Sequence, residues 1–270
     1  MMSKHVLSIQ DLSCLGKCSL TVALPVLSAM GCRCSVLPTA VFSTHTAFPS
    51  PHKHSLTEQI LPISRHWQTI GAEFDAITVG YLADGSQVQA VEEVLDTFPA
   101  FTVIDPVMGD HGKLYSGLSD THVEAVRSLC RRGQVLLPNV TEAALLTKLP
   151  YQPQAEESYY RSLLEKLLEL GAPNVVITGA SVTEGMTGVA GYCQEEGFFF
   201  FQRKLLKQSH HGTGDLFAAV FTGAVMSGKT IPQAAFLAAS FVEQVILATP
   251  EATPFGVAFE GVLPWLWQQL

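Results

Sequence analysis

The sequence has few charged residues and no basic cluster. Asp, Glu, Lys and Arg make up 15% of the 270 residues, and the formal net charge is -8. Proteins that bind nucleic acid place clustered Lys and Arg against the phosphate backbone, so we expect no nucleic-acid partner. A phosphate ligand would instead require backbone N–H groups, helix N-termini and a metal ion.

Long apolar runs and metal-binding cysteine pairs are also lacking. No apolar run reaches the roughly 18 residues of a membrane span, and the first residues, MMSKHVLSIQ, lack the apolar core of a signal peptide. We therefore expect a cytoplasmic protein without a membrane partner. The six cysteines include no C-x-x-C pair, which disfavours a zinc site.

What is present is a regular alternation of strand-like and helix-like stretches in a chain that is 47% hydrophobic. The pattern predicts strands at 4–10, 34–42, 75–82, 100–107, 134–139 and 174–179, and helices at 19–31, 55–71, 86–98, 121–133, 141–149, 155–170, 213–227, 231–248 and 259–269. Such alternation predicts an α/β fold, with a central, mostly parallel sheet and helices on both faces. Residues 188–206 contain the turn QEEG and predict an antiparallel edge. We expect one domain over residues 1–270.

Two loops interrupt the alternation near its start. Residues 11–18 form a polar loop, and residues 43–54, STHTAFPSPHKH, form a longer one that we expect to cover a site. His52 and His54 have metal-ligand spacing, but exposed histidines on a flexible loop are the favoured explanation, since no further ligand lies near in sequence.

Residues 210–230, HHGTGDLFAAVFTGAVMSGKT, contain two candidate phosphate motifs. GAVMSGKT matches G-x-x-x-x-G-K-[ST], but that motif requires a strand before it and a helix after it. Here the pattern predicts a buried helix ending at Gly228. Lys229 then follows the C-terminus, where the helix dipole repels phosphate. A functional phosphate loop at this end is therefore disfavoured.

GTGD has the context that the other motif lacks, because it follows a polar loop and begins the helix. The amides of Gly212, Thr213 and Gly214 would face an anion at the helix N-terminus. Asp215 has two interpretations that local sequence does not separate. It either complements the helix dipole or accepts a proton from a substrate hydroxyl that attacks phosphorus. His210 and His211 are expected to position this turn.

Acidic residues follow two predicted strands. Asp105 ends one strand and Asp110 lies in the loop beyond, within VIDPVMGDHG; Asn139 and Glu142 follow the next strand, in PNVTE. Open α/β sheets bind ligands at the carboxyl ends of their strands, and carboxylate oxygens suit Mg²⁺. Capping of loops and helices is the alternative explanation. We expect these motifs and GTGD to meet at one edge of the sheet.

These motifs, in order along the chain, resemble the vitamin B6 kinases of the ribokinase-like superfamily. The resemblance is carried by LSIQ, VFSTHT, VGY, DPVMGD, PNVTE and GTGDLFAA. It implies a three-layer α/β fold, a homodimer, and ATP-dependent phosphorylation of the hydroxymethyl group of a pyridine.

The resemblance also implies roles for individual residues. Asp215 would be the base, with Gly212, Thr213 and Gly214 as the anion hole. The positions implied for Mg²⁺ are Asp105, Asp110 and Glu142, and those implied for ATP are Asp105, Asn139, Glu142 and Thr178. The positions implied for the pyridine are Asp11, Thr46, Tyr81 and Asp215. The resemblance also raises the possibility of a monovalent cation as a further cofactor.

Two positions depart from the family pattern. Asp11 stands where Ser is common, and a carboxylate there would favour pyridoxamine by a charge-assisted hydrogen bond. Thr178 stands where some members have Lys. Three alternatives remain: a hydroxymethylpyrimidine kinase of thiamine synthesis, in which Cys often replaces the base; a sugar kinase, whose lid and N-terminal glycine-rich element are not evident; and a non-catalytic B6 or nucleotide sensor.

Overall fold

The computed structural model describes residues 3–206, 210–250 and 253–269. By its internal contacts the chain divides into two compact units. The first consists of Met1–Phe101 and Leu206–Leu270, and the second of Thr102–Leu205. The expectation of one domain over the whole chain stays a prediction.

The sheet of the first unit is mostly parallel. Its strand order is β4-β1-β2-β3, with β1 (His5–Ser13), β2 (Arg33–Phe42), β3 (Lys53–Ser55) and β4 (Ala76–Val79). β1 pairs in parallel with β2 and β4, and β3 is an antiparallel edge. The prediction of a loop from residue 11 was wrong, because β1 continues to Ser13 past a register shift between Gln10 and Leu12. The prediction of a loop through residue 54 was wrong at its end, where β3 pairs with β2.

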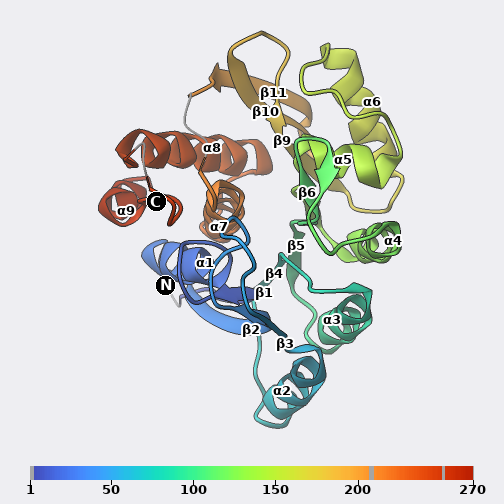
Figure 1. The fold of residues 1–270 in the computed structure, drawn as a ribbon, viewed down its shortest axis with the longest axis vertical. Helices are drawn as coiled ribbons and strands as arrows, with labels where there is room; N and C mark the ends of the chain where they lie inside the picture. The colour runs from blue at the N-terminus through green and yellow to red at the C-terminus, as the bar shows by residue number, and fades with distance from the viewer. Residues whose placement is uncertain (1–2, 207–209, 251–252, 270) are drawn as a thin grey trace. The chain divides into compact units, whose positions relative to one another are not determined.

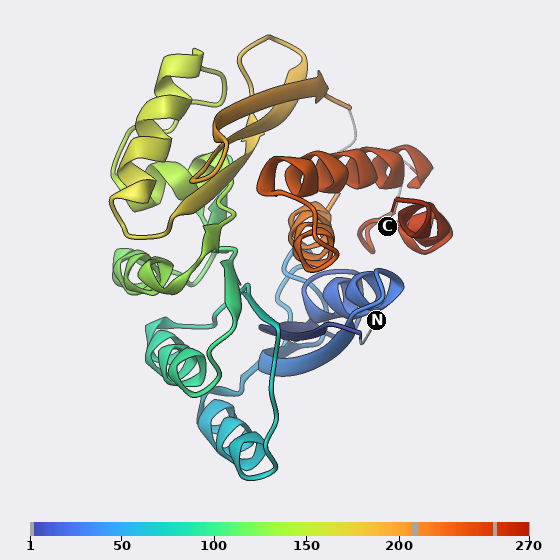
Figure 2. The same cartoon turned by 180° about the vertical axis from the view of Figure 1, so that it is seen from behind.

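Helices cover both faces of this sheet. α1 (Leu20–Ala29) packs on β1 and β2 and contacts α7 (Thr213–Met226), while α2 (Thr57–Thr69) and α3 (Gly85–Thr97) pack together. Figures 1 and 2 show α1 and α7 on one side of the strands, with α2 and α3 on the other. The predicted helices are confirmed with small shifts of their ends. The exception is 259–269, which is reduced to η2 (Glu260–Val262) and α9 (Leu263–Trp267).

α8 (Ile231–Ala248) packs against α7. Within the described residues it is the one helix long and apolar enough to cross a membrane, so the statement that no apolar run reaches that length was wrong. One such helix is weak evidence for a membrane protein, because a core helix of a soluble protein passes the same test of length and composition. About a third of α8 is buried, on the side that includes Ala234, Ala238 and Phe241.

The second unit combines a parallel and an antiparallel part. Its strand order is β11-β10-β9-β8-β5, with β5 (Phe101–Ile104), β8 (Val135–Leu136), β9 (Asn174–Ala180), β10 (Met186–Cys193) and β11 (Gly197–Lys204). β5, β8 and β9 are parallel, and β10 pairs antiparallel with β9 and β11. The predicted hairpin with an antiparallel edge is confirmed.

The helices of the second unit are α4 (Asp120–Leu129), η1 (Cys130–Arg132), α5 (Val140–Thr147) and α6 (Glu157–Leu168). α5 packs on β9, and α6 on β9 and β10. Sequence analysis missed a short hairpin of β6 (Gly109–Asp110) and β7 (Lys113–Leu114). It places Asp110 on a two-residue strand rather than in an open loop.

Candidate active site

The turn before α7 requires glycine at one position. Gly212 is the N-cap residue with φ of 88°, in the left-handed region. A Cβ there would lie 2.4 Å from the carbonyl oxygen of Lys17, so backbone packs directly on backbone. Gly214 differs, since a Cβ would meet nothing within 4 Å. Its amide is therefore at an open helix N-terminus, where an anion is stabilised.

Asp215 lies in the first turn of α7 and is half-buried. The pKa of its carboxyl group is raised from 3.8 to about 6 as the net result of three causes: burial, the largest, raises it, the backbone amide of Ser19 lowers it, and the charge of Asp11 raises it. A carboxyl group with a pKa near 6 is ionised at neutral pH and still accepts a proton well. General bases are tuned to this range.

Asp11 is brought close to Asp215 by the end of β1. Its side chain is 5% exposed. Its two oxygens accept hydrogen bonds from the hydroxyls of Ser19, at 2.5 Å, and Ser13, at 3.3 Å. Burial raises its pKa, and both hydroxyls and the charge of Lys53 lower it.

Tyr81 follows β4 and packs edge-on against Phe42, with ring centroids 5.8 Å apart. Its hydroxyl lies 3.2 Å from the ammonium nitrogen of Lys53, which is also over both aromatic rings. Burial raises the pKa of Tyr81 to about 12, with a contribution from the charge of Asp11. Asp11, Tyr81 and Lys53 therefore interact electrostatically within the first unit.

The loop after β2 is tied to the C-terminal part of the chain. His45 is buried and its Nε2 lies 2.9 Å from the carbonyl oxygen of Pro254. Its ring stacks on His211 at 5.1 Å, directly before the GTGD turn. Thr46, the predicted substrate contact, is exposed beside it.

The two histidines that were considered for metal binding are exposed, His52 at the end of the loop and His54 on β3. The described residues contain no group of three or more His, Cys, Asp or Glu side chains that would hold a metal ion.

In the second unit, Glu142 and Asn139 form a reciprocal cap at the start of α5. Asn139 Oδ1 accepts from the amide of Glu142 at 2.9 Å, and Glu142 Oε2 accepts from the amide of Asn139 at 2.8 Å. Glu142 Oε1 accepts from the amide of Met108 at 3.1 Å. Glu142 is 3% exposed, and burial raises its pKa well above the usual range. The carboxylate therefore joins α5 to the loop after β5.

The remaining predicted nucleotide and metal positions lie around this cap. Asp105 directly follows β5 and is half-buried, and Asp110 is exposed on β6. Asn139 Nδ2 donates to the carbonyl oxygen of Gly109 at 2.9 Å, and Thr178 on β9 pairs with Asn139 across a β-bridge. The charge of Asp110 adds to the raised pKa of Glu142. Asp110, Asn139, Glu142 and Thr178 are thus brought together within this unit.

The donor set fits Mg²⁺ unevenly. Hard carboxylate oxygens are the ligands that Mg²⁺ prefers, and it usually keeps several waters. Asp110 offers an exposed carboxylate, whereas both oxygens of Glu142 already accept backbone amides. The arrangement fits Asp110 as a direct ligand and Glu142 as a group that orients its surroundings. The meeting of these residues with the GTGD motif stays a prediction.

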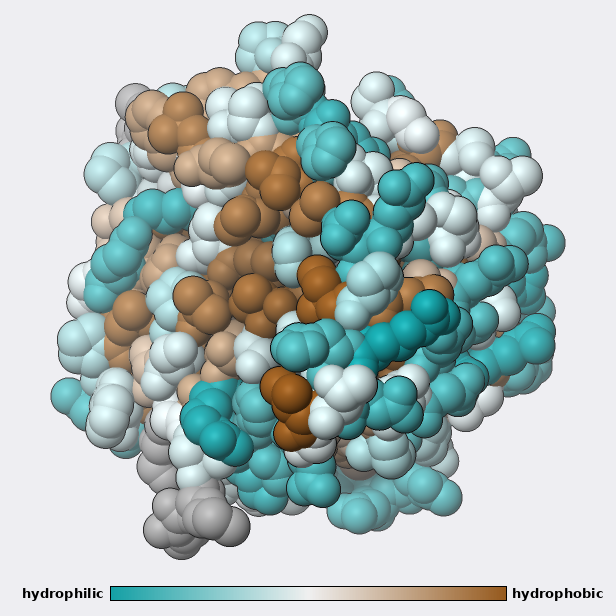
Figure 3. Space-filling model, turned by 90° about the horizontal axis from the view of Figure 1, so that it is seen from below, coloured by the Kyte–Doolittle hydropathy of each residue, from teal (hydrophilic) through white to brown (hydrophobic). Residues whose placement is uncertain are grey.

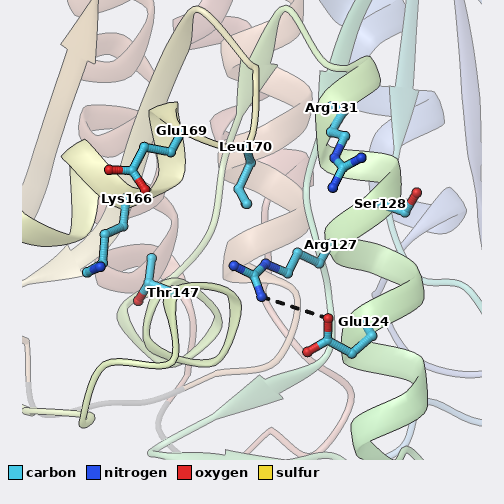
Figure 4. Close-up of a pocket in the computed structure, with 8 residues that line it drawn as sticks. All are labelled: Glu124, Arg127, Ser128, Arg131, Thr147, Lys166, Glu169 and Leu170. Carbon is cyan, nitrogen blue, oxygen red and sulfur yellow. Dashed lines mark ion pairs between the residues drawn. The ribbon is translucent and has the colours of Figure 1, made fainter.

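A pocket in the second unit contains none of the predicted site residues (Figure 4). Its lining consists of Glu124, Arg127, Ser128, Arg131, Thr147, Lys166, Glu169 and Leu170. Most of these residues lie at or just after the C-terminal ends of α4, α5 and α6, with Arg131 in η1 and Glu124 in the middle of α4. Basic side chains there complement the negative ends of the helix dipoles, so the pocket is not an anion site of the GTGD kind.

The second glycine motif has the structure that disfavours phosphate. α7 ends at Met226, and Gly228 has φ of 93° in the terminating turn. Lys229 donates its amide to the carbonyl of Ala224, beyond the helix end. The prediction that GAVMSGKT is a helix C-terminus is confirmed.

Two residues of the first unit were missed by sequence analysis. Ser19 contacts Asp11 and faces Asp215, yet a serine at this position in the sequence indicated only the start of a helix. Lys53 lies over Phe42 and Tyr81, but the surrounding HKH reads as loop. Neither residue type carried a signal, because both contacts depend on tertiary structure.

Comparisons with known proteins agree on the family. The chain matches the phosphomethylpyrimidine kinase family over residues 23–258. It is 34% identical to a putative phosphomethylpyrimidine kinase of Bacteroides thetaiotaomicron crystallised with pyridoxal, with a TM-score of 0.93 over 98% of this chain and 96% of that one. It is 30% identical to pyridoxal kinase of Lactobacillus plantarum, with a TM-score of 0.90 over 100% and 98%.

A further relative extends the agreement at the level of sequence. The chain is 28% identical over 268 residues to the pyridoxine/pyridoxal/pyridoxamine kinase of Bordetella bronchiseptica, covering 92% of this chain and 90% of that protein. The fold is therefore the α/β ribokinase-like fold of the kinases. The chain belongs to the phosphomethylpyrimidine kinase family, within which its resemblance to the vitamin B6 kinases is confirmed.

Proposed function

We propose that the protein transfers the terminal phosphoryl group of ATP to the hydroxymethyl group of a vitamin B6 vitamer, giving the 5′-phosphate. The observation that carries this proposal is Asp215, a half-buried carboxylate with a pKa of about 6 at the N-terminus of α7. The similarity to B6 kinases and to a pyridoxal-bound protein supports the substrate class.

In this proposal Asp215 accepts the proton of the vitamer hydroxyl as its oxygen attacks phosphorus. The amides of Gly212, Thr213 and Gly214 stabilise charge on the transferring group, because donors fixed at a helix N-terminus need no reorganisation. Asp11, Thr46 and Tyr81 contact or enclose the pyridine ring. Cytoplasmic location and a monovalent cation belong to the same proposal.

For the second unit by itself, the proposed role is to bind the nucleotide and its metal ion. Asp110 binds Mg²⁺ directly, and Asp105 and Glu142 assist in holding the metal ion. Asn139 and Thr178 contact the nucleotide. Mg²⁺, when bound, neutralises charge on the phosphates of ATP. Glu142 contributes by holding the amides of Met108 and Asn139, which fixes the loop that presents Asp110.

A homodimer is part of the proposal. Large hydrophobic side chains of the first unit remain exposed, including Leu15, Leu24 and Trp267. Figure 3 shows hydrophobic residues gathered near the centre of one face, with hydrophilic ones around them. Exposed apolar patches of this kind are typical of contact surfaces.

The test is steady-state phosphorylation, with Mg-ATP, of pyridoxamine, pyridoxal, pyridoxine and hydroxymethylpyrimidine side by side. We expect turnover of a B6 vitamer that falls by roughly 10²–10⁴ in Asp215→Ala, the usual effect of losing a general base. Turnover of the pyrimidine alone would assign the second candidate, which the family name favours. Binding of a vitamer without turnover would indicate a sensor and refute the proposal.

Asp11 bears on the choice of vitamer. Its carboxylate would favour the amine of pyridoxamine over the aldehyde of pyridoxal. Asp11→Ser should then shift the ratio of kcat/KM values toward pyridoxal. An unchanged ratio would remove Asp11 from vitamer selection.

A further inference from the structure

Ser19 has a backbone conformation that serine rarely adopts. Its φ is 51° and its ψ is -124°, a combination favoured by glycine in tight turns. Residues held in such regions persist only where the surrounding structure requires them, and they gather at functional sites. The contacts of Ser19 therefore need an explanation beyond the start of a helix.

An ordinary helix cap does not explain this residue. Ser19 is the N-cap of α1, but its side chain makes no capping hydrogen bond. Its hydroxyl instead donates to Asp11 Oδ1 at 2.5 Å. The hydroxyl therefore donates to a carboxylate on β1, and the N-terminus of α1 is left without a side-chain capping hydrogen bond.

The other polar groups of Ser19 are also engaged. Its carbonyl oxygen accepts from the amides of Val22 and Ala23, at 3.0 and 2.9 Å, which anchors it to the first turn of α1. Its backbone amide faces the carboxyl group of Asp215 on the adjacent α7. One residue therefore lies between two carboxyl groups that come from different elements.

Few ionisable groups surround the two carboxyl groups of Asp11 and Asp215. Asp11 and Cys18 face Asp215, and Asp11 is faced in turn by Lys53, Tyr81 and Cys18. Burial raises the pKa of both carboxyl groups, while contacts with Ser19 lower them. Because the Asp11 charge raises the pKa of Asp215, whatever sets the ionisation of Asp11 also acts on Asp215.

We infer that Ser19 is a positioning residue that links Asp11 and Asp215, through its hydroxyl and its backbone amide respectively, while its β-bridge to Leu12 holds its backbone against the end of β1. The inference rests on the proposed function of Asp215 as the base. It adds that base strength is set from outside α7, by a serine and a second carboxylate.

The test compares Ser19→Gly and Ser19→Ala with the wild type. Glycine relieves the strain and keeps the amide, so this variant should fold even if alanine, which keeps the strain without the hydroxyl, does not. Ser50→Gly is the matched control, because Ser50 also has φ of 51° but is exposed in the loop after β2. Thermal denaturation establishes that each variant is folded.

In both Ser19 variants the ionised form of Asp11 loses the hydrogen bond from the hydroxyl. The pKa of Asp11 therefore rises, and Asp11 stays protonated up to a higher pH. Its repulsion of the Asp215 charge then weakens, and the pKa of Asp215 falls. We expect the acidic limb of kcat/KM for a B6 vitamer, near pH 6 in the wild type, to move down by roughly 0.5–1 unit. We also expect kcat/KM to fall roughly 10- to 100-fold, because residue 19 is no longer fixed to Asp11 and its amide holds Asp215 less precisely. Ser50→Gly should move neither.

A second readout does not depend on activity. Carbon-13 NMR of the aspartate carboxyl groups follows both titrations directly, with Asp11→Asn and Asp215→Asn assigning the signals. A higher pKa for Asp11 and a lower one for Asp215 in Ser19→Gly would support the inference. Unchanged titrations of both groups would overturn it. If the wild type phosphorylates no vitamer, the proposed function fails, and the NMR titration still tests the link.

Discussion

Replacing the base by its neutral isostere should stabilise the protein while removing activity. In Asp215→Asn the shape is kept but the charge is not. The folded-state pKa of Asp215 is about 6 against 3.8 in an ordinary setting. At about 1.4 kcal/mol per pKa unit, the ionised carboxyl group disfavours folding by about 3 kcal/mol at pH 8.

The sign of the pH dependence follows from the direction of the shift. A raised folded-state pKa means that the folded protein prefers the protonated group, so this contribution to stability is present below pH 3.8 and is lost as the pH rises through 6. The advantage of Asp215→Asn should therefore be about 3 kcal/mol at pH 8 and below about 1 kcal/mol at pH 4.

Urea denaturation of both proteins at pH 8 and pH 4 measures this difference. Asp120→Asn is the matched control, since Asp120 also lies in the first turn of a helix but is exposed. That control should lose a few tenths of a kcal/mol to about 1 kcal/mol from the helix dipole. An Asp215→Asn protein no more stable than wild type at pH 8, or equally stabilised at pH 4, would refute the reasoning.

Three further predictions concern other parts of the site. Gly212→Ala should lose about 2–5 kcal/mol of stability, because φ is positive there and a Cβ would clash with backbone. Gly214→Ala should fold normally, because a Cβ there meets nothing, but it should lose turnover. Equal unfolding midpoints in urea for the two variants would contradict the difference in stability. Glu142→Ala should cost about 1–3 kcal/mol for each of the two amides left without an acceptor, measured as a lower Tm; an unchanged Tm would count against the cap. Lys229→Ala should leave the KM for ATP unchanged, because Lys229 lies past the end of α7; a large rise would return the phosphate to that motif.

The helices and most strands were predictable because their apolar periodicity is strong and their ends carry glycine or capping residues. Gly31 and Gly171 end helices with φ of 78° and 115°, as the pattern indicates. The continuation of β1 through Asp11 was not predictable, because a polar residue there looks like loop until its hydroxyl partners are known. The β6–β7 hairpin is too short to show a period of two.

The individual motifs of the candidate site were predictable from the sequence, whereas the contacts between their side chains were not. GTGD begins a helix as expected, since glycine at a loop-to-helix junction has few other uses. Glu142 was assigned to metal, although an Asn three residues before a Glu is itself a capping signal. Ser19 was beyond sequence analysis, because its contact with Asp11 joins a strand to a helix start across a bulge.

The contacts of the loop after β1 also bear on how the protein folds during synthesis. The amide of Lys17 donates to the carbonyl of Phe255, its ammonium group pairs with Glu260 at 2.7 Å, and its carbonyl packs against Gly212. All three partners lie in the last quarter of the chain. Domains usually acquire structure from the N-terminus as they leave the ribosome. Here the first loop cannot reach its final form until nearly the whole polypeptide has emerged, so a nascent chain stalled before residue 250 would lack the contacts of Lys17 with Phe255 and Glu260.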